Sequence, residues 1–284
     1  MTGSRVMTRK RPPRLPWRVI YISLAVMMGL LPLIWTVLAS FGVTVNNSSP
    51  PKWSGTPNFE HFREAVLSKP AFVSALLNSA GVAALNTLVA TFTAFLAAYA
   101  LARSRFLARD LLVQGLLVLA GLPVIAYLMP LRATLTALHL YDTLIGTALA
   151  GGALFAPLAT YVLYGFMRHM PLEPEQAAQL EGANPLQVLW KVIWPISRPS
   201  VVATAIVVFV LAWNQFLLPI ASTFQLKTVP VMIIDFFTFE RESDWPSAAA
   251  ALIAALVPVL LLVAVMHRWL EHFSLGGAHD ESIS

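Results

Sequence analysis

The stretch PLEPEQAAQLEGANPLQVLWKVIWPISRP, residues 171–199, lies between two runs that are apolar enough to cross a membrane. It is polar and rich in helix-forming residues, and Gly182 interrupts it near the middle. Asn184 followed by Pro185 is a typical helix start, because an Asn side chain caps free N–H groups and Pro is tolerated at the first helical position. The stretch therefore predicts a helix, a glycine break and a second helix.

Composition places the rest of the chain in a membrane. Of the 284 residues, 57% are hydrophobic and 12% are charged, and the mean hydropathy is +0.70. These values leave too little polar surface to cover a soluble globule of this size. Cysteine is absent, which excludes a disulfide framework, a thiolate metal site and a cysteine nucleophile.

Six apolar runs, each of about 20 residues, predict membrane-spanning helices. They cover residues 17–40, 80–101, 111–130, 144–167, 201–222 and 247–266. The first run is too long for a signal-peptide core, so we expect it to be retained. Because helices satisfy the backbone within a bilayer, the fold class is predicted to be an all-α polytopic membrane protein with six transmembrane helices. In the loop after the first run, residues 58–68 have apolar side chains at helical spacing and predict a short surface helix.

The distribution of basic residues predicts the orientation of the chain. Thirteen of the 19 Lys and Arg residues lie in residues 1–18, 102–110, 168–199 or after residue 266. By the positive-inside rule these segments, and both termini, are cytoplasmic. We therefore expect a basic tail at 1–16, a membrane domain at 17–267 that includes the loop 171–199, and a second cytoplasmic tail at 268–284. The basic tail is interpreted as a topology signal and not as a nucleic-acid arm, so no nucleic acid partner is expected.

Polar residues within the spans are few. The centres of the six runs hold no Asp, Glu, Lys, Arg or His, which argues against a proton relay, an intramembrane metalloprotease and a charge-coupled antiporter. The adjacent Trp213, Asn214 and Gln215 either face a central cavity and bind a polar solute, or join helices by hydrogen bonds. The Gly151-Gly152 pair predicts close helix packing at mid-span.

Motifs for catalysis are not found in the sequence. It contains neither a Gly-x-x-x-x-Gly-Lys phosphate loop nor a His-Glu-x-x-His metal motif. We therefore expect no catalytic, cofactor-binding or metal-binding residues in this chain, and no hydrolysis by it.

The spacing within residues 171–199 resembles the cytoplasmic EAA loop of permease subunits from binding-protein-dependent ABC importers. That loop has Glu-Ala-Ala, three residues, Gly, nine residues and Ile-x-Leu-Pro. Here Gln176 starts the pattern, Gly182 follows at the same spacing, and Pro195 ends it. Gln176 replaces Glu, Trp194 replaces Leu and Glu181 replaces Asp. The resemblance implies that the residues coupling to an ATPase are Glu175, Gln176, Ala177, Ala178, Glu181, Gly182, Ala183 and Pro195.

Further motifs are similar to the carbohydrate branch, in particular to the shorter permease of maltose-type importers. They are Asn78-Ser79, Ala98 to Arg103, Pro171 and Trp213 to Phe216. The resemblance implies the type I importer permease fold in the bacterial plasma membrane, surrounded by lipid, and import of a sugar, oligosaccharide or related polyol. It also implies three partners: a homologous permease, a dimer of ATPase subunits that holds the ATP and magnesium, and an extracellular solute-binding protein.

Two other functions stay open at this stage. One is an importer for another class of solute, and the other is a secondary transporter or membrane scaffold that works without ATP. In the second helix of the loop, Leu186, Leu189, Trp190 and Ile193 form an apolar face at helical spacing. We expect two short helices around Gly182 to form a knob that seats this face in a cleft of the ATPase, whose closure would swing the attached spans between inward-open and outward-open states.

Overall fold

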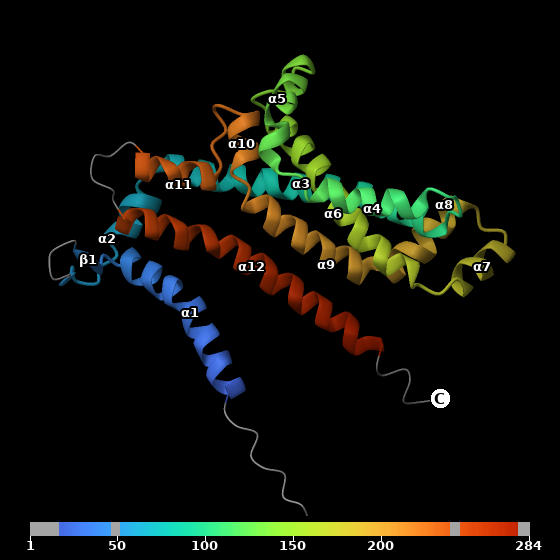
Figure 1. Ribbon diagram of the computed structural model, residues 1–284, viewed down its shortest axis with the longest axis horizontal. Helices are drawn as coiled ribbons and strands as arrows, with labels where there is room; N and C mark the ends of the chain where they lie inside the picture. The colour runs from blue at the N-terminus through green and yellow to red at the C-terminus, as the bar shows by residue number, and fades with distance from the viewer. Residues whose placement is uncertain (1–16, 47–51, 239–244, 278–284) are drawn as a thin grey trace, which may run out of the picture.

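A computed structural model describes residues 17–46, 52–238 and 245–277. The predicted basic tail at 1–16 and residues 278–284 of the predicted C-terminal tail lie outside the described residues. The described chain contains five long helices: α1 (Trp17–Ser40), α3 (Pro70–Arg103), α6 (Leu144–Arg168), α9 (Trp194–Trp213) and α12 (Trp245–Gly277) (Figure 1). Within the described chain, five helical stretches are long and apolar enough to cross a membrane, and a sixth is obtained if one bent pair counts as a span.

The bent pair corresponds to the third predicted span. Helix α4 (Arg109–Ala120) is followed by the 3₁₀ helix η2 (Val124–Tyr127) and by α5 (Leu128–Ala137), with a 95° change of direction. Gly121 ends α4 and Pro123 follows it, so the helix cannot continue, because Pro lacks an N–H and disfavours the helical region for its predecessor. The span predicted over 111–130 is thus bent and not one continuous helix, and α5 projects from the bundle (Figure 1).

The fifth predicted span is shorter at its outer end and longer at its inner end. Helix α9 ends at Trp213, and α10 (Leu217–Ser222) follows, because Pro219 would clash with the carbonyl of Gln215 in a continuous helix. At the other end, α8 (Pro185–Gln187) and the π-helical η3 (Val188–Ile193) run into α9 as one helix. The second helix of the loop is therefore the start of a span, and the prediction that this helix is short is wrong.

The remaining boundaries also extend the predicted spans. Helix α3 begins at Pro70, well before residue 80, with the proline in the first turn where its missing N–H costs nothing. Helix α12 continues to Gly277, into the segment assigned to a C-terminal tail. Helices thus continue past the apolar runs from which the spans were predicted.

The outer end of the molecule carries short elements. A hairpin of β1 (Thr44–Asn46) and β2 (Lys52–Ser54) pairs Thr44 with Ser54, and three-residue strands are too short to show an alternating pattern in the sequence. At its base, a Cβ on Gly55 would lie 2.0 Å from the carbonyl oxygen of Gly42, so only glycine fits. The predicted surface helix is present as α2 (Glu60–Phe62) and η1 (Arg63–Leu67), whereas α11 (Val229–Thr238) was not predicted.

Among the described elements, helices α3 and α6 make the most extensive contact, and each contributes more residues to the main buried cluster than any other helix. A Cβ on Gly151 would lie 2.3 Å from Nδ2 of Asn86, and a Cβ on Gly152 would lie 2.5 Å from Cγ1 of Val89. The backbones approach this closely because neither glycine has a side chain. The close packing predicted for this pair is confirmed.

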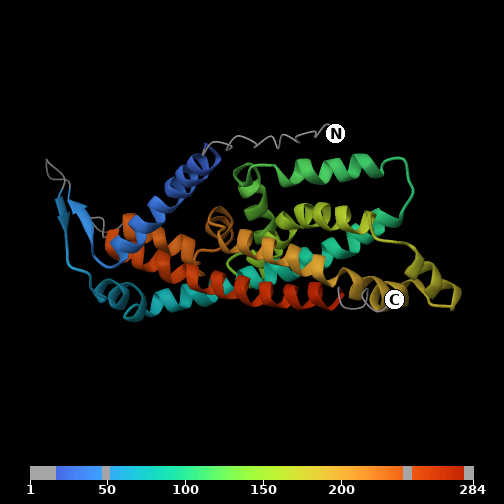
Figure 2. The same ribbon diagram turned by 90° about the horizontal axis from the view of Figure 1, so that it is seen from below.

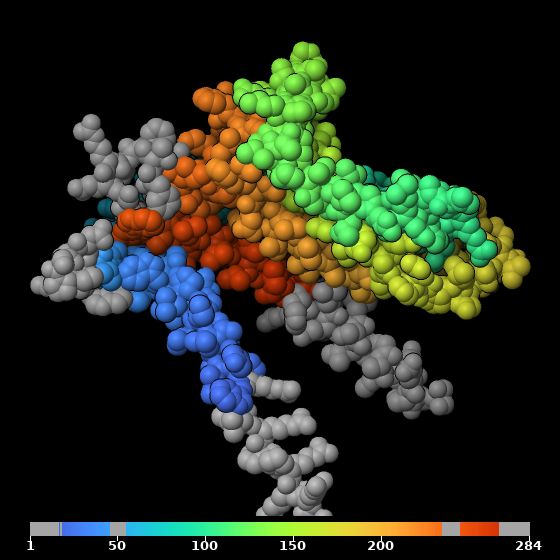
Figure 3. Space-filling model, in the orientation of Figure 1, coloured from blue at the N-terminus to red at the C-terminus, as the bar shows by residue number. Residues whose placement is uncertain are grey.

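Helix α1 stands apart from this bundle. Ala39 and Ser40 at its C-terminal end are buried, and it contacts α12 there, but it diverges from the other helices toward Trp17 (Figures 2 and 3). Most of its large apolar side chains are exposed. Because the helix is apolar on all sides, its surface requires lipid or another protein subunit.

Candidate functional site

The loop 171–199 lies at the end of the molecule opposite the β-hairpin (Figure 1). Helix α7 (Glu173–Leu180) ends at a reversal in which Gly182 has a φ of +88°, a conformation that favours glycine. The next helix starts with a capping box: Asn184 Oδ1 accepts from the Gln187 N–H at 2.8 Å, and Gln187 Oε1 accepts from the Asn184 N–H at 2.9 Å. The predicted helix start at Asn184 and glycine break are confirmed.

The predicted apolar docking face is largely turned into the chain itself. Leu189 and Ile193 are buried in the core. The Trp190 ring lies 6.4 Å from the Phe92 ring and 5.9 Å from the Phe95 ring, on α3. Only Leu186 remains largely exposed, at 68%. This face anchors the loop to the membrane helices, because such large apolar side chains gain most when removed from water.

The water-facing surface of the loop is its tip. Leu180 is 90% exposed, and Glu181 and Gly182 beside it are exposed too. Of the other predicted coupling residues, Gln176, Ala177 and Pro195 are exposed, whereas Ala178 and Ala183 are half-buried against the core. A cleft of about 320 Å³ separates α7 from the next helix and is lined by Ala178, Glu181, Gly182, Ala183, Gln187, Lys191 and Val192. The tip thus combines exposed leucines with a small polar cleft.

Glu175 differs from the other predicted coupling residues because it is 5% exposed. Its Oε1 accepts from Nε of Arg103 at 2.7 Å and also from Nη2, and its Oε2 accepts from the Tyr99 hydroxyl at 3.4 Å. Nη1 of Arg103 donates to the carbonyl oxygen of Met167, in the last turn of α6, at 3.0 Å. Arg103 is a site residue that the sequence predicted only as part of the Ala98 to Arg103 motif, since nothing in the spacing pairs it with Glu175.

The three residues predicted for a solute pathway lie at the break between α9 and α10. Trp213 is 5% exposed and stacks on Phe209 with ring centroids 5.8 Å apart, so its ring belongs to the core of the chain. Asn214 is exposed, and its Nδ2 donates to the Val210 carbonyl at 2.8 Å within its own helix. Gln215 is half-buried. At the surface of this chain Asn214 is therefore exposed and Gln215 partly exposed, whereas the Trp213 ring is buried.

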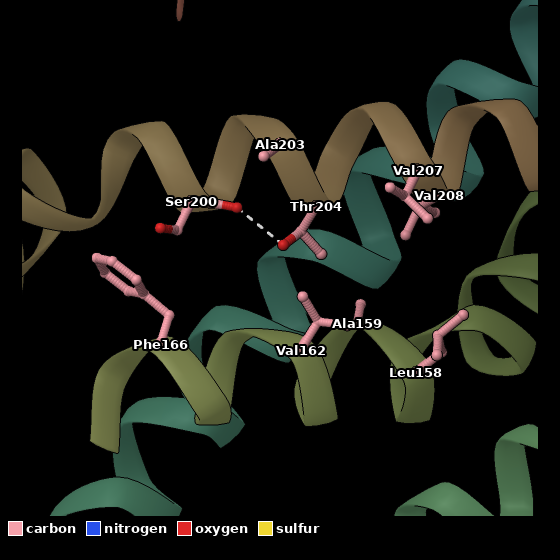
Figure 4. A pocket seen from close by; sticks show the side chains of 9 residues that line it. All are labelled: Leu158, Ala159, Val162, Phe166, Ser200, Ala203, Thr204, Val207 and Val208. Carbon is pink, nitrogen blue, oxygen red and sulfur yellow. Dashed lines mark hydrogen bonds between the residues drawn. The ribbon is translucent and has the colours of Figure 1, made fainter. Parts of the chain in front are cut away.

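Two apolar hollows lie between the long helices. One of about 230 Å³ lies between α6 and α9, where Val162 and Phe166 face Ser200 and Thr204 (Figure 4). Its Thr204 hydroxyl donates to the Ser200 carbonyl at 2.8 Å. The other, of about 400 Å³, lies between α3, α9 and α12 and includes Thr91. Both are lined mainly by apolar side chains, with Ser200 and Thr204 in the first and Thr87 and Thr91 in the second.

Residues 90–274 match the model of a family described as "Binding-protein-dependent transport system inner membrane component". The chain belongs to this family. As a family member it is a permease subunit, a transport component and not an enzyme, and a multi-pass protein of the plasma membrane. The permease is one component of a multi-subunit importer.

Its similarity to curated relatives extends over most of its length. It is 34% identical to the trehalose transport system permease protein SugB of Mycobacterium tuberculosis, over 89% of this chain and 92% of the relative. It is 31% identical to the sulfoquinovosyl glycerol transport system permease protein SmoH of Agrobacterium fabrum, over 92% and 93%. It is 28% identical to the trehalose/maltose transport system permease protein MalG of Thermococcus litoralis, over 92% and 96%.

The fold also has a solved counterpart. A chain from the crystal structure of a bacterial ABC transporter involved in the import of the acidic polysaccharide alginate superposes with a TM-score of 0.70. The match covers 89% of this permease and 94% of that chain at 17% sequence identity. The predicted type I importer permease fold is confirmed.

At the outer end of the permease, Asp142 ties two segments together. Its Oδ1 accepts from the Thr223 hydroxyl at 2.6 Å and from the N–H groups of Phe224 and Gln225 at 2.8 and 3.0 Å. Its own N–H donates to the carbonyl of Ser222 at 2.9 Å. These bonds fasten the chain after α10 to the turn before α6. We call this group the outer strap.

The outer strap predicts a pH dependence. The Thr223 hydroxyl, followed by the two N–H groups, holds the pKa of the Asp142 carboxyl below its ordinary value. A depressed folded-state pKa adds stability that is fully present above the ordinary pKa of the carboxyl and is lost as the pH falls through the lowered pKa. Asp142→Ala should therefore raise amide exchange at Phe224 and Gln225 by on the order of tenfold at neutral pH. Hydrogen exchange measured from neutral to strongly acid pH checks this; equal exchange in both proteins at neutral pH would contradict it.

Proposed function

We propose that this permease forms half of the translocation pathway of an ATP-driven importer for a sugar, oligosaccharide or related polyol. We further propose that the loop 171–199 couples it to a cytoplasmic ATPase. The observation that carries the proposal is the loop tip, which exposes Leu180 and Leu186 to water while the rest of the loop is anchored on α3 and α9. Exposed apolar side chains on a rigidly held support are typical of a docking site.

The solute class is supported by the relatives. SugB and the Thermococcus litoralis protein are named for trehalose or maltose, and SmoH for a sulfoquinovosyl glycerol. A homologous permease would supply the other half of the pathway, which agrees with hollows that open on the surface of this chain. Asn214 and Gln215 are the residues of this half that we assign to the pathway. A solute-binding protein outside the membrane would deliver the sugar.

The mechanism requires no reaction in this chain. A dimer of ATPase subunits would bind ATP and magnesium and, on closing, move the tip at Leu180 to Gly182. The movement reaches the membrane directly, because the helix after Asn184 continues without a break into α9. Gln176, Ala177, Ala178, Glu181, Ala183 and Pro195 would line or support the contact. An exposed Gln176 provides a hydrogen-bonding surface in place of a charge.

Substitutions at the tip test this proposal. Gly182→Asp places a charge on the exposed tip, and Ala178→Asp places one in the cleft behind it; both should abolish ATP-driven uptake. The complete importer is reconstituted in vesicles, and the sugar is the one that the companion binding protein retains in a screen begun with trehalose and maltose. The control is Leu107→Asp, because Leu107 is fully exposed in the connection between α3 and α4 and lies outside the loop 171–199. Normal ATP-driven uptake and normal ATPase assembly in both tip variants would contradict the coupling assignment.

A further inference from the structure

We propose that Glu175 and Arg103 act as a positioning pair that transmits the movement of the loop to α3 and α6, and that Glu175 does not contact the ATPase. We call the two residues, with Tyr99, the inner clamp. The inference rests on the proposed coupling function of the loop, but it assigns Glu175 a different role from that of the exposed tip residues.

The burial of the inner clamp is the first argument. The side chain of Glu175 is 6% exposed and that of Arg103 is 18% exposed. Both carboxylate oxygens are engaged within the chain, Oε1 by Arg103 and Oε2 by Tyr99. A docking protein would have to remove Arg103 before it could reach this carboxylate, whereas Leu180 and Glu181 are accessible without any rearrangement.

The position of Arg103 is the second argument. It is the last residue of α3, and its guanidinium bonds at the same time to Glu175 of α7 and to the Met167 carbonyl of α6. That carbonyl lies in the last turn of α6, where carbonyl groups lack partners within the helix and a cation is favourable. The planar guanidinium thus holds three helix ends in one fixed geometry.

The other contacts of α7 are apolar and do not fix its orientation. It contacts η3, and the loop's small Ala178 and Ala183 pack on the core there. Two methyl groups exclude little water and can slide, whereas a charged pair with several hydrogen bonds fixes both distance and angle. Movement of the loop therefore reaches the membrane helices in two ways. The continuous helix transmits it to α9, and the inner clamp transmits it to α3 and α6.

Loss of the inner clamp should then uncouple the importer without releasing the ATPase. In Glu175→Gln or Arg103→Gln the tip is unchanged, so the ATPase should copurify in the wild-type ratio and hydrolyse ATP. Sugar uptake per ATP hydrolysed should fall by about tenfold, because the route from the loop into α3 and α6 is lost. Arg103→Lys keeps the charge but not the planar fork, so it should fold as the wild type and lose about threefold.

The experiment uses the complete importer in vesicles, with copurified ATPase, ATP hydrolysis and sugar uptake measured on the same preparations. Asp110→Asn is the matched control, because it neutralises a carboxylate in the exposed Arg109–Asp110 pair and should change nothing. The double variant Glu175→Gln with Arg103→Gln should be no worse than either single variant, since the two act as one unit.

Three outcomes would overturn the inner clamp. One is loss of the ATPase from Glu175→Gln with retention in Arg103→Gln and Arg103→Lys, which would make the carboxylate an ATPase contact. The others are unchanged uptake per ATP in all variants, or additive losses in the double variant. These outcomes differ from those expected if the loop had no coupling function at all. In that case the wild-type chain would not retain the ATPase, and Gly182→Asp would have no effect.

Discussion

Gly152→Ala is expected to destabilise the permease by about 1–3 kcal/mol, as overpacking does in a tight core. The added methyl would lie 2.5 Å from Cγ1 and 2.7 Å from Cβ of Val89. Rotation of the Val89 side chain cannot relieve the second contact, because a Cβ atom is fixed by the backbone. Helices α3 and α6 would have to separate, and they contribute more residues to the main buried cluster than any other pair of helices. The measurement is the thermal midpoint of the purified permease in detergent.

Gly165→Ala is the control on the same helix. No atom lies within 4 Å of a Cβ added there, so the substitution should be neutral or stabilise by up to about 1 kcal/mol through the higher helix propensity of alanine. If both variants had the same midpoint, close packing at Gly152 would not contribute to stability.

Properties that depend on hydropathy and local chemistry could be predicted from the sequence. The spans could be predicted from apolar runs of sufficient length, because a helix is one of the few structures that satisfy the backbone within a bilayer. The start at Asn184, the break at Gly182 and the tight packing at Gly151 and Gly152 also followed, since each depends on one residue type and its neighbours.

The direction of the helices and the contacts between distant residues could not be predicted in the same way. Hydropathy over 111–130 did not reveal the 95° turn after Gly121, although Pro123 marks it in retrospect. The face containing Leu189 and Ile193 was expected to meet another protein, because periodicity identifies an apolar face but not what covers it. The pairing of Arg103 with Glu175, and of Asp142 with Thr223, joins residues far apart in the chain, so only the folded structure shows it.

Replacing Leu180 and Leu186 together with Ser is expected to release the ATPase from the importer while leaving the permease folded. Both side chains are exposed, at 90% and 68%, so their loss removes little from the core, and stability should change by less than about 0.5 kcal/mol. Full burial of a leucine at an interface is worth about 1.5–3 kcal/mol. Removal of both should weaken ATPase binding by on the order of a hundredfold or more, provided that both are buried on docking.

The matched control for this pair is Leu107→Ser. Leu107 is fully exposed in the connection between α3 and α4, another segment on the predicted cytoplasmic side, but it is not part of the loop 171–199. ATPase retained on the tagged permease, and its dissociation rate after dilution, should therefore match the wild type in Leu107→Ser and be lost in the double variant. If the double variant kept the ATPase, the docking surface would have to lie outside the tip. If Leu107→Ser lost it equally, the surface would extend over the end of α3, so that ATPase closure would act on Arg103 from its own helix as well as through the inner clamp.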